Sequence, residues 1–337
     1  MKDAKKRSDI VDIFFFEVFE EEAAALKHYL NPEIDAGFTW KTIQEYKEEK
    51  PPASLISIRT QSVIPVSWAE NLSGILSRST GYDHMERYLK TVKKNLPCGY
   101  LPLYCSRAVA EQAMLMWMFL LRKMHLQIEK FSVFNRNGLT GIECEHKTLL
   151  IVGVGNIGHE VAKIGRGLGM EVLGVDIEEK HSDVIYVSLE EGLSAADIIV
   201  CAMNLTPDTV NYFDYQVLKK AKQGVIFINI SRGEISPSES LLRLLDENHI
   251  GGLGLDVYNE ERELVLFLRD GRTGRNIEVN AALTLLKRPD VILTPHNAFN
   301  SFEAVDRKAN HSVKQINHFL NEGCFLWPVP VHIIDNI

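Results

Sequence analysis

The sequence predicts an α/β protein built from two doubly wound parallel sheets. Strand-like apolar runs alternate with amphipathic helical segments along the whole chain, which is the pattern of parallel sheets covered by helices. A glycine-rich turn between a strand and a helix begins only at residue 153. A long stretch of the same alternating pattern precedes that turn, and a length of 337 residues fits about two domains.

The part of the chain before the glycine-rich turn predicts a compact series of elements. Apolar and β-branched runs predict strands, and longer amphipathic stretches predict helices. The predicted strands cover residues 10–18, 53–60 and 73–79, with a short extended piece at 98–104. The predicted helices cover residues 19–29 and 83–94 and, as one long helix, residues 108–131.

The part after the turn repeats this alternation. The predicted strands lie near residues 184–188, 197–203, 224–230, 251–257 and 291–295, with helices in the intervals. A last helix near 301–321 leads into an irregular tail. Residues 236–239, Ser-Pro-Ser-Glu, predict a capping box with proline at the first helical position.

Composition excludes several classes of function. A net charge of −8 without a long basic run gives no support for nucleic-acid binding. The polar start MKDAKKRSD lacks the apolar core of a signal peptide, and the apolar stretch 113–121 is too short to cross a bilayer. Five scattered cysteines without metal-ligand spacing fit a reducing compartment. We therefore expect a cytoplasmic protein with no nucleic-acid, membrane or metal partner.

The most informative segment is residues 149–176, which reads as strand, glycine turn, helix and second strand with an acidic end. Gly153, Gly155 and Gly158 form the pattern G-x-G-x-x-G, and Asp176 follows at the distance typical of a dinucleotide-binding Rossmann unit. The helix N-terminus suits a pyrophosphate, and the acid suits a ribose diol, so NAD is favoured over NADP. The predicted cofactor-binding residues here are Gly153, Gly155, Asn156, Ile157, Gly158 and Asp176.

The position of this segment predicts a discontinuous domain arrangement. The Rossmann domain is expected at residues 108–297, inserted into a flavodoxin-like substrate domain formed by residues 1–107 and 298–337. The long helix from residue 108 and the segment after Pro295 are the expected crossings. A ligand cleft is then expected at the carboxyl ends of the strands, where open α/β sheets bind their ligands.

Three chemically useful side chains follow successive predicted strands. Arg232 follows the strand in NISRGE, and its planar guanidinium suits bidentate binding of a carboxylate. Glu261 follows the strand that ends in LDVYNEE, and His296 follows the strand that ends in TPHNAF. A histidine beside a carboxylate is held in one tautomer and suits general acid–base chemistry near neutral pH. We expect Arg232, Glu261 and His296 to be the catalytic residues.

Five segments together resemble the D-isomer-specific 2-hydroxyacid dehydrogenase family, and most closely its D-lactate dehydrogenase branch. The segments are RSTGYDH (78–84), LYCSRAVAEQA (103–113), the glycine-rich segment with Asp176, NISRGE (229–234), and LDVYNEE with TPHNAF. This resemblance implies two α/β domains, the cofactor NAD(H), and reversible reduction of a 2-oxo acid to a D-2-hydroxy acid. It also implies a homodimer formed through the NAD-binding domain.

The resemblance implies roles residue by residue. Arg232 binds the substrate carboxylate and 2-oxo oxygen, His296 exchanges the proton, and Glu261 orients His296 and favours its charged form. Thr80 and Gly81 provide further backbone donors to the carboxylate, and Tyr104 and Phe299 line a small substrate pocket, which favours pyruvate. The remaining expected cofactor contacts are Asn204, Thr206 and Asp256.

Alternatives remain at the level of the substrate and of the class of protein. Arg59 in SIRTQS has the charge to select a larger or acidic 2-oxo acid. The segment MNLTPDT and the long connection 262–284, whose role is open, also suit phosphite or another dehydrogenase of the same superfamily. An NAD(H)-sensing, corepressor-like binding protein on the same scaffold is the alternative outside enzymes, because a fold does not fix a function.

Overall fold

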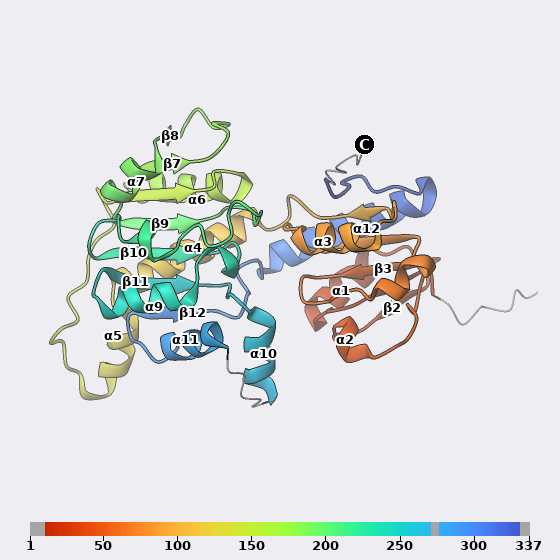
Figure 1. Cartoon of the computed structure of the whole chain (residues 1–337), viewed down its shortest axis with the longest axis horizontal. Coiled ribbons are helices and arrows are strands. Elements are labelled where there is room, and N and C mark those ends of the chain that lie inside the picture. Colours follow the sequence, from red (N-terminus) through yellow and green to blue (C-terminus); the bar gives the residue numbers. More distant parts are fainter. Residues whose placement is uncertain (1–10, 271–275, 331–337) are drawn as a thin grey trace, which may run out of the picture. The chain divides into compact units, whose positions relative to one another are not determined.

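The computed structural model describes residues 11–270 and 276–330 of the 337-residue chain. Contacts within the chain divide it into two units, and Figure 1 traces both. Unit 1 comprises Met1–Cys105 and Ser301–Ile337, and unit 2 comprises Ser106–Asn300. Ile10, the first residue of the strand predicted at 10–18, lies outside the described residues.

Unit 1 contains a five-stranded parallel sheet in the order β2-β1-β3-β4-β5. This order is that of flavodoxin-like folds. The strands are β1 (Ile13–Phe15), β2 (Ala36–Phe38), β3 (Leu55–Ile58), β4 (Gly74–Ser77) and β5 (Cys98–Gly99). The helices of unit 1 are α1 (Glu20–Tyr29), α2 (Ile43–Tyr46), η1 (Val66–Asn71), α3 (Asp83–Val92) and α12 (Phe302–Glu322).

Local chemistry accounts for the ends of helix α12, which returns the chain to unit 1. The side chain of Ser301 accepts a hydrogen bond from the N–H of Ala304 and caps the first turn. Gly323 ends the helix with φ 73°, a left-handed conformation that glycine adopts without strain. Between these ends α12 packs beside α1 and buries apolar residues such as Ile316.

Unit 2 contains a seven-stranded parallel sheet in the order β12-β11-β10-β9-β6-β7-β8 (Figure 1). The strands are β6 (Thr148–Val152), β7 (Glu171–Val175), β8 (Ile185–Tyr186), β9 (Ile198–Cys201), β10 (Val225–Asn229), β11 (Ile250–Leu255) and β12 (Val291–Leu293). Chain order runs outward from β6 in one direction and from β9 in the other, so the order reverses between these neighbours. Open α/β sheets bind ligands at such a switch point.

Helices cover the sheet of unit 2. They are α4 (Ser106–Leu121), α5 (Met124–Lys130), η2 (Phe131–Val133), α6 (Asn156–Gly167), α7 (Leu189–Ala195), α8 (Tyr215–Leu218), η3 (Gly233–Ile235), α9 (Ser238–Asp246), α10 (Glu261–Asp270) and α11 (Ile277–Leu285). Helix α4 packs on β10 and β11, and its Trp117 is fully buried. A Cβ added at Gly254 would lie 3.1 Å from Cβ of Met116, so this glycine permits the close approach.

The structure corrects several details of the sequence prediction. The helix predicted at 108–131 is broken, because α4 ends at Leu121 and Lys123 adopts φ 50° before α5 begins. The predicted capping box is wrong, since α9 begins at Ser238 without a side-chain cap. The N–H of Ser238 instead donates to the carboxylate of Glu278 at 2.6 Å. The connection at 262–284 is largely helical and contains α10 and α11.

Two further findings concern the predicted surroundings of the protein. In the described residues no helix is both long enough and apolar enough to cross a membrane. All five cysteines are free; Cys98, Cys105, Cys144 and Cys201 are buried, and Cys324 is exposed.

Candidate active site

Three neighbouring strands of unit 2 carry the predicted catalytic residues at one edge of the sheet. Strand β11 pairs in parallel with β10 on one side and with β12 on the other, with Leu255 opposite Asn229 and Leu293. Because parallel strands point the same way, the chain leaves all three strands at the same edge. Arg232, Glu261 and His296 lie in the segments that follow β10, β11 and β12.

His296 and Glu261 form a direct pair at this edge. Nδ1 of His296 lies 2.9 Å from Oε1 and 3.0 Å from Oε2 of Glu261. Both side chains are about four-fifths buried, with 23% and 21% exposed. A carboxylate on Nδ1 fixes the ring orientation and leaves Nε2 as the ring atom able to exchange a proton with a bound molecule.

Asp256 holds the loop that carries His296. Its carboxylate accepts hydrogen bonds from Thr294 Oγ1 at 2.5 Å and from the N–H groups of Asn297 and Ala298 at 2.8 and 2.9 Å. Burial raises the pKa of Asp256, while these hydrogen bonds oppose the rise. His296 has φ 50°, a backbone conformation uncommon outside glycine, so the Asp256 contacts hold a bend that the chain would otherwise disfavour.

The loop that carries Arg232 packs closely against the segment that leads to Glu261. A Cβ added at Gly233 would lie 1.8 Å from the backbone carbon of Tyr258, so only glycine fits there. The backbone oxygen of Arg232 accepts a hydrogen bond from Asn229 Nδ2 at 2.9 Å. Its guanidinium donates from Nη1 to the oxygen of Ser231 at 2.9 Å. These contacts fix the arginine loop relative to the His296–Glu261 pair.

The glycine turn after β6 has the shape that a dinucleotide needs. Gly153 adopts φ 94°, and a Cβ there would lie 2.7 Å from the backbone of Ala202 after β9. A Cβ at Gly158 would lie 2.0 Å from the oxygen of Gly153, so helix α6 packs directly on the turn. A Cβ at Gly155 would meet no atom within 4 Å, so the backbone there is open to a ligand. The N–H groups that begin α6 have no partner inside the helix and suit a pyrophosphate.

Asp176 lies at the end of β7 and supports this turn. Its Oδ2 accepts the N–H of Val154 at 2.6 Å, and its Oδ1 accepts the N–H of Glu178 at 3.1 Å. A carboxylate has about four acceptor positions, so Asp176 keeps capacity for a ribose diol. Asn204 and Thr206 lie on the exposed turn after β9, which Thr209 Oγ1 closes through a 2.8 Å bond to the oxygen of Asn204.

The remaining predicted substrate residues are distributed over both units. Thr80 Oγ1 donates to the oxygen of Leu101 at 3.2 Å, and Gly81 accepts from Ser79 Oγ at 2.8 Å, so both belong to the ordered loop after β4. Tyr104 is buried in unit 1, and Phe299 is buried in unit 2. Arg59, directly after β3, is half-buried.

Sequence reasoning missed two residues that shape the site. Tyr258 donates its hydroxyl hydrogen to the oxygen of Thr294 at 2.7 Å, which links the segment after β11 to the end of β12. Thr294 in turn donates to Asp256. Both lie in the motifs already singled out, LDVYNEE and TPHNAF, but only the fold shows that they face one another.

The geometry defines a class of protein: a dinucleotide-binding oxidoreductase with a histidine–glutamate pair and an arginine at the carboxyl edge of its sheet. Comparisons with known proteins narrow the class. Residues 112–298 match the family model described as D-isomer specific 2-hydroxyacid dehydrogenase, NAD binding domain. The chain belongs to the D-isomer specific 2-hydroxyacid dehydrogenase family, whose cofactor is NAD, and is an NAD-dependent oxidoreductase acting on CH–OH groups.

Individual relatives agree with this assignment. The chain is 33% identical over 257 residues to 2-hydroxyacid dehydrogenase homolog 1 of Schizosaccharomyces pombe, covering 74% of this chain and 76% of that protein. It is 31% identical to the D-lactate dehydrogenase of Escherichia coli, covering 72% and 75%. A crystal structure of D-lactate dehydrogenase from Aquifex aeolicus, complexed with NAD and lactic acid, has a TM-score of 0.81 and 25% identity over 94% of this chain and 99% of that chain.

Proposed function

We propose that this enzyme reversibly reduces pyruvate to D-lactate with NADH, and that His296 is the acid–base residue. Curated relatives named D-lactate dehydrogenase support the substrate. The observation that carries the proposed chemistry is the contact between His296 Nδ1 and Glu261, because it orients the ring and leaves Nε2 to exchange the proton. Arg232 lies at the same sheet edge, where its guanidinium is proposed to bind the carboxylate of the substrate.

In the proposed reaction Arg232 binds the pyruvate carboxylate through its planar guanidinium and polarises the 2-oxo group. Bound NADH supplies the hydride that the carbonyl carbon accepts. His296 donates its Nε2 proton to the carbonyl oxygen, so that the product is a neutral hydroxyl group. Glu261 stabilises the imidazolium before transfer and holds the ring in place. In the oxidative direction, neutral His296 removes the hydroxyl proton.

We further propose that the substrate pocket is small. Thr80 and Gly81 are proposed to offer backbone donors to the carboxylate, and Tyr104 and Phe299 to limit the space beside the methyl group. The two aromatic side chains are only 4% and 7% exposed, so they are held in place by packing. Fixed large side chains exclude bulky 2-oxo acids more effectively than mobile ones do.

A second candidate substrate is a 2-oxo acid with an additional carboxylate, which a cationic cluster in unit 1 favours. Glu22 Oε1 lies 2.9 Å from Arg78 Nε and 2.6 Å from Lys308 Nζ, and all three side chains are fully buried. The charge of Arg59 also acts on Glu22 and Lys308. Burial lowers the pKa of Lys308 to about 7, although Glu22 opposes the fall. Arg59 and Arg78 are cations that share the single carboxylate of Glu22, and a further anion would offset the excess positive charge.

One experiment separates these candidates. NADH consumption is measured with pyruvate, 2-oxobutyrate, phenylpyruvate, 4-methyl-2-oxopentanoate, glyoxylate and oxaloacetate, and NAD reduction with phosphite. A maximum of kcat/KM at pyruvate supports D-lactate formation. A maximum at oxaloacetate that disappears in Arg59→Gln supports the acidic substrate. Activity with phosphite alone, or binding of NADH without any turnover, contradicts both.

His296→Ala tests the proposed acid–base role in the same assay. It should lower kcat roughly 10²- to 10⁴-fold while NADH binding persists, since general acid–base catalysis contributes about that much. Retention of near wild-type kcat would show that another group transfers the proton.

We also propose that the enzyme is a homodimer formed through unit 2. An apolar group of side chains around α5 and η2 supports this proposal, because they are more than half exposed in the single chain. They are Ile128, Phe131, Val133, Phe134 and Ile142. Exposed apolar groups of this kind mark protein interfaces. Light scattering after size exclusion should give the mass of two chains, and Phe131→Glu should give one; a single-chain mass for the unaltered protein contradicts the proposal.

A further inference from the structure

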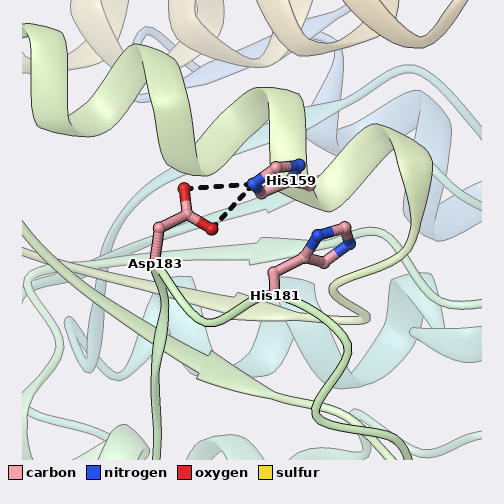
Figure 2. Close-up of side chains that lie close together, drawn as sticks. All are labelled: His159, His181 and Asp183. Carbon is pink, nitrogen blue, oxygen red and sulfur yellow. Dashed lines mark hydrogen bonds and ion pairs between the residues drawn. The ribbon is translucent and has the colours of Figure 1, made fainter.

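Two histidines and an aspartate converge at the edge of unit 2, away from the His296–Glu261 pair in the chain. His159 lies on α6, whereas His181 and Asp183 lie on the turn between β7 and β8 (Figure 2). One ligand atom from each of the three residues can be chosen so that all three lie within 4.8 Å of one another. We propose that His159, His181 and Asp183 form a binding site for a divalent transition-metal ion, with Zn²⁺ as the reference ion.

The ligand types favour transition metals over magnesium or calcium. Imidazole nitrogens suit Zn²⁺, Co²⁺ and Ni²⁺, whereas Mg²⁺ and Ca²⁺ prefer oxygen ligands throughout. Around Zn²⁺, bonds of about 2.0–2.1 Å place neighbouring ligand atoms roughly 3.3 Å apart in a tetrahedron. Nε2 of His159 already lies 3.0 and 3.1 Å from the two carboxylate oxygens of Asp183. Three protein ligands leave a fourth position for water.

The turn holds its two ligands in place before any ion binds. The rings of His159 and His181 are stacked, with centroids 3.7 Å apart and planes inclined by 11°. The N–H of Val184 donates to the oxygen of His181 at 3.1 Å, and the N–H of His181 donates to the hydroxyl of Tyr186 at 3.2 Å. The backbone of His181 is therefore fixed beside His159 and Asp183. Because stacked rings direct their lone pairs along parallel planes, the ring of His181 must turn out of the stack to bind an ion shared by His159 and Asp183.

The charged side chains around the site determine how tightly it should bind a metal ion. Arg166 Nη1 donates to the backbone oxygen of Asp183 at 2.8 Å, and Nη2 contacts the carboxylate. Lys163 acts on His181 through its charge, and Asp176 acts in the opposite sense. The two cations oppose a divalent ion, so the site should bind Zn²⁺ more weakly than a closed structural site does. Arg166 still leaves one carboxylate oxygen for the ion.

The test uses untagged, full-length protein stripped of metal with chelator. Cys324 is first replaced by serine, because its Sγ lies 3.6 Å from His318 Nε2 and this exposed pair can bind zinc by itself. Zn²⁺ is titrated by calorimetry, and Co²⁺ is followed by its visible absorption. His181→Asn and Asp183→Asn are the test variants. His146→Asn is the matched control, because His146 is exposed and has φ 59°, which asparagine tolerates.

We expect the Cys324→Ser protein to bind one Zn²⁺ per chain and to give tetrahedral Co²⁺ bands. We expect both test variants, but not His146→Asn, to lose at least tenfold in affinity for Zn²⁺. Thermal unfolding and NADH binding without metal should match in all variants, which separates loss of a ligand from loss of folding. Equal affinity in His181→Asn and in the control, or no binding to the Cys324→Ser protein, overturns the proposal. Neither result depends on which 2-oxo acid the enzyme uses.

Discussion

Nδ1 of His296 lies 2.9 Å from Oε1 of Glu261, although 35 residues separate the two in the chain. Two different strands deliver them to one sheet edge: Glu261 begins α10 after β11, and His296 follows β12. The contact therefore depends on the sheet order. Any substitution that disturbs the loops after these strands should affect catalysis before it affects cofactor binding.

Glu261→Gln keeps the shape of the side chain and removes its charge. We expect kcat for pyruvate reduction to fall roughly tenfold or more, because Nδ1 of His296 loses the carboxylate that orients its ring. The kcat for pyruvate is the measurement, and Glu260→Gln, which alters the preceding exposed carboxylate, is the control. A kcat equal to that of the control would show that Glu261 does not act through His296.

Asp256→Asn should disturb the loop of His296 without touching its ring. One carboxylate oxygen accepts from the N–H of Ala298, and the other accepts from both the hydroxyl of Thr294 and the N–H of Asn297. An amide nitrogen in either place faces donors, so we expect a loss of about 1–3 kcal/mol in the free energy of unfolding and a lower kcat. Urea unfolding of this variant and of Asp246→Asn, an exposed carboxylate, provides the comparison. Equal stability of the two variants would contradict this account.

Asp176→Ser should reduce the preference for NADH over NADPH. The carboxylate repels a 2′-phosphate, and its removal should improve NADPH use on the order of tenfold. Because Asp176 also accepts the N–H of Val154, some loss of NADH affinity should accompany the change. The Kd values for NADH and NADPH are the measurement, and the exposed Glu179→Gln is the control. An unchanged ratio of the two Kd values would mean that another group distinguishes the cofactors at the ribose.

Glu22 should make unit 1 sensitive to acid. Burial raises the pKa of Glu22, but Arg78 and Lys308 outweigh burial and lower it to about 2 from 4.5. A lowered folded-state pKa contributes stability that is complete above pH 4.5 and is lost as the pH falls toward 2. Glu22→Gln should lose about 3–5 kcal/mol at neutral pH, because it leaves buried cations without their carboxylate. The free energy of unfolding of this variant should also change less with pH between those two values.

Unfolding by denaturant at several pH values measures this effect. Glu70→Gln is the matched control, because Glu70 forms an exposed ion pair with Lys94 in the same unit. If Glu22→Gln and Glu70→Gln showed the same stability and the same loss of stability at low pH, the buried ion pairs of Glu22 would not account for the sensitivity to acid.

Much of the fold was predictable because its strands are buried and apolar. Strands β6, β9 and β10 are continuous apolar runs bounded by polar or glycine residues, and burial on both faces makes that pattern unambiguous. Strand β2, three residues long with Gly37 at its centre, and the four-residue α2 were missed. Elements this short carry too few residues for a period to be recognised.

Other features depend on contacts that no local pattern encodes. Residues 118–130 contain neither glycine nor proline, so nothing in the sequence marks the break at Lys123. Because Arg232, Glu261 and His296 each follow a predicted strand, the sequence already indicated that they lie at one edge of the sheet. Their roles in catalysis stay predictions. The group of His159, His181 and Asp183 was not predicted, because its members meet only when the turn before β8 closes against α6.

The fit of Gly233 against Tyr258 has a consequence for protein engineering. Since no side chain larger than hydrogen can be placed there, the arginine loop and the segment that leads to Glu261 fit each other only as a pair. A chimera that exchanges only the arginine loop with a relative would bring together two backbones not shaped for each other. Exchange of the whole stretch, together with the His296 loop that Tyr258 reaches, is the smallest exchange that keeps Arg232 and His296 aligned.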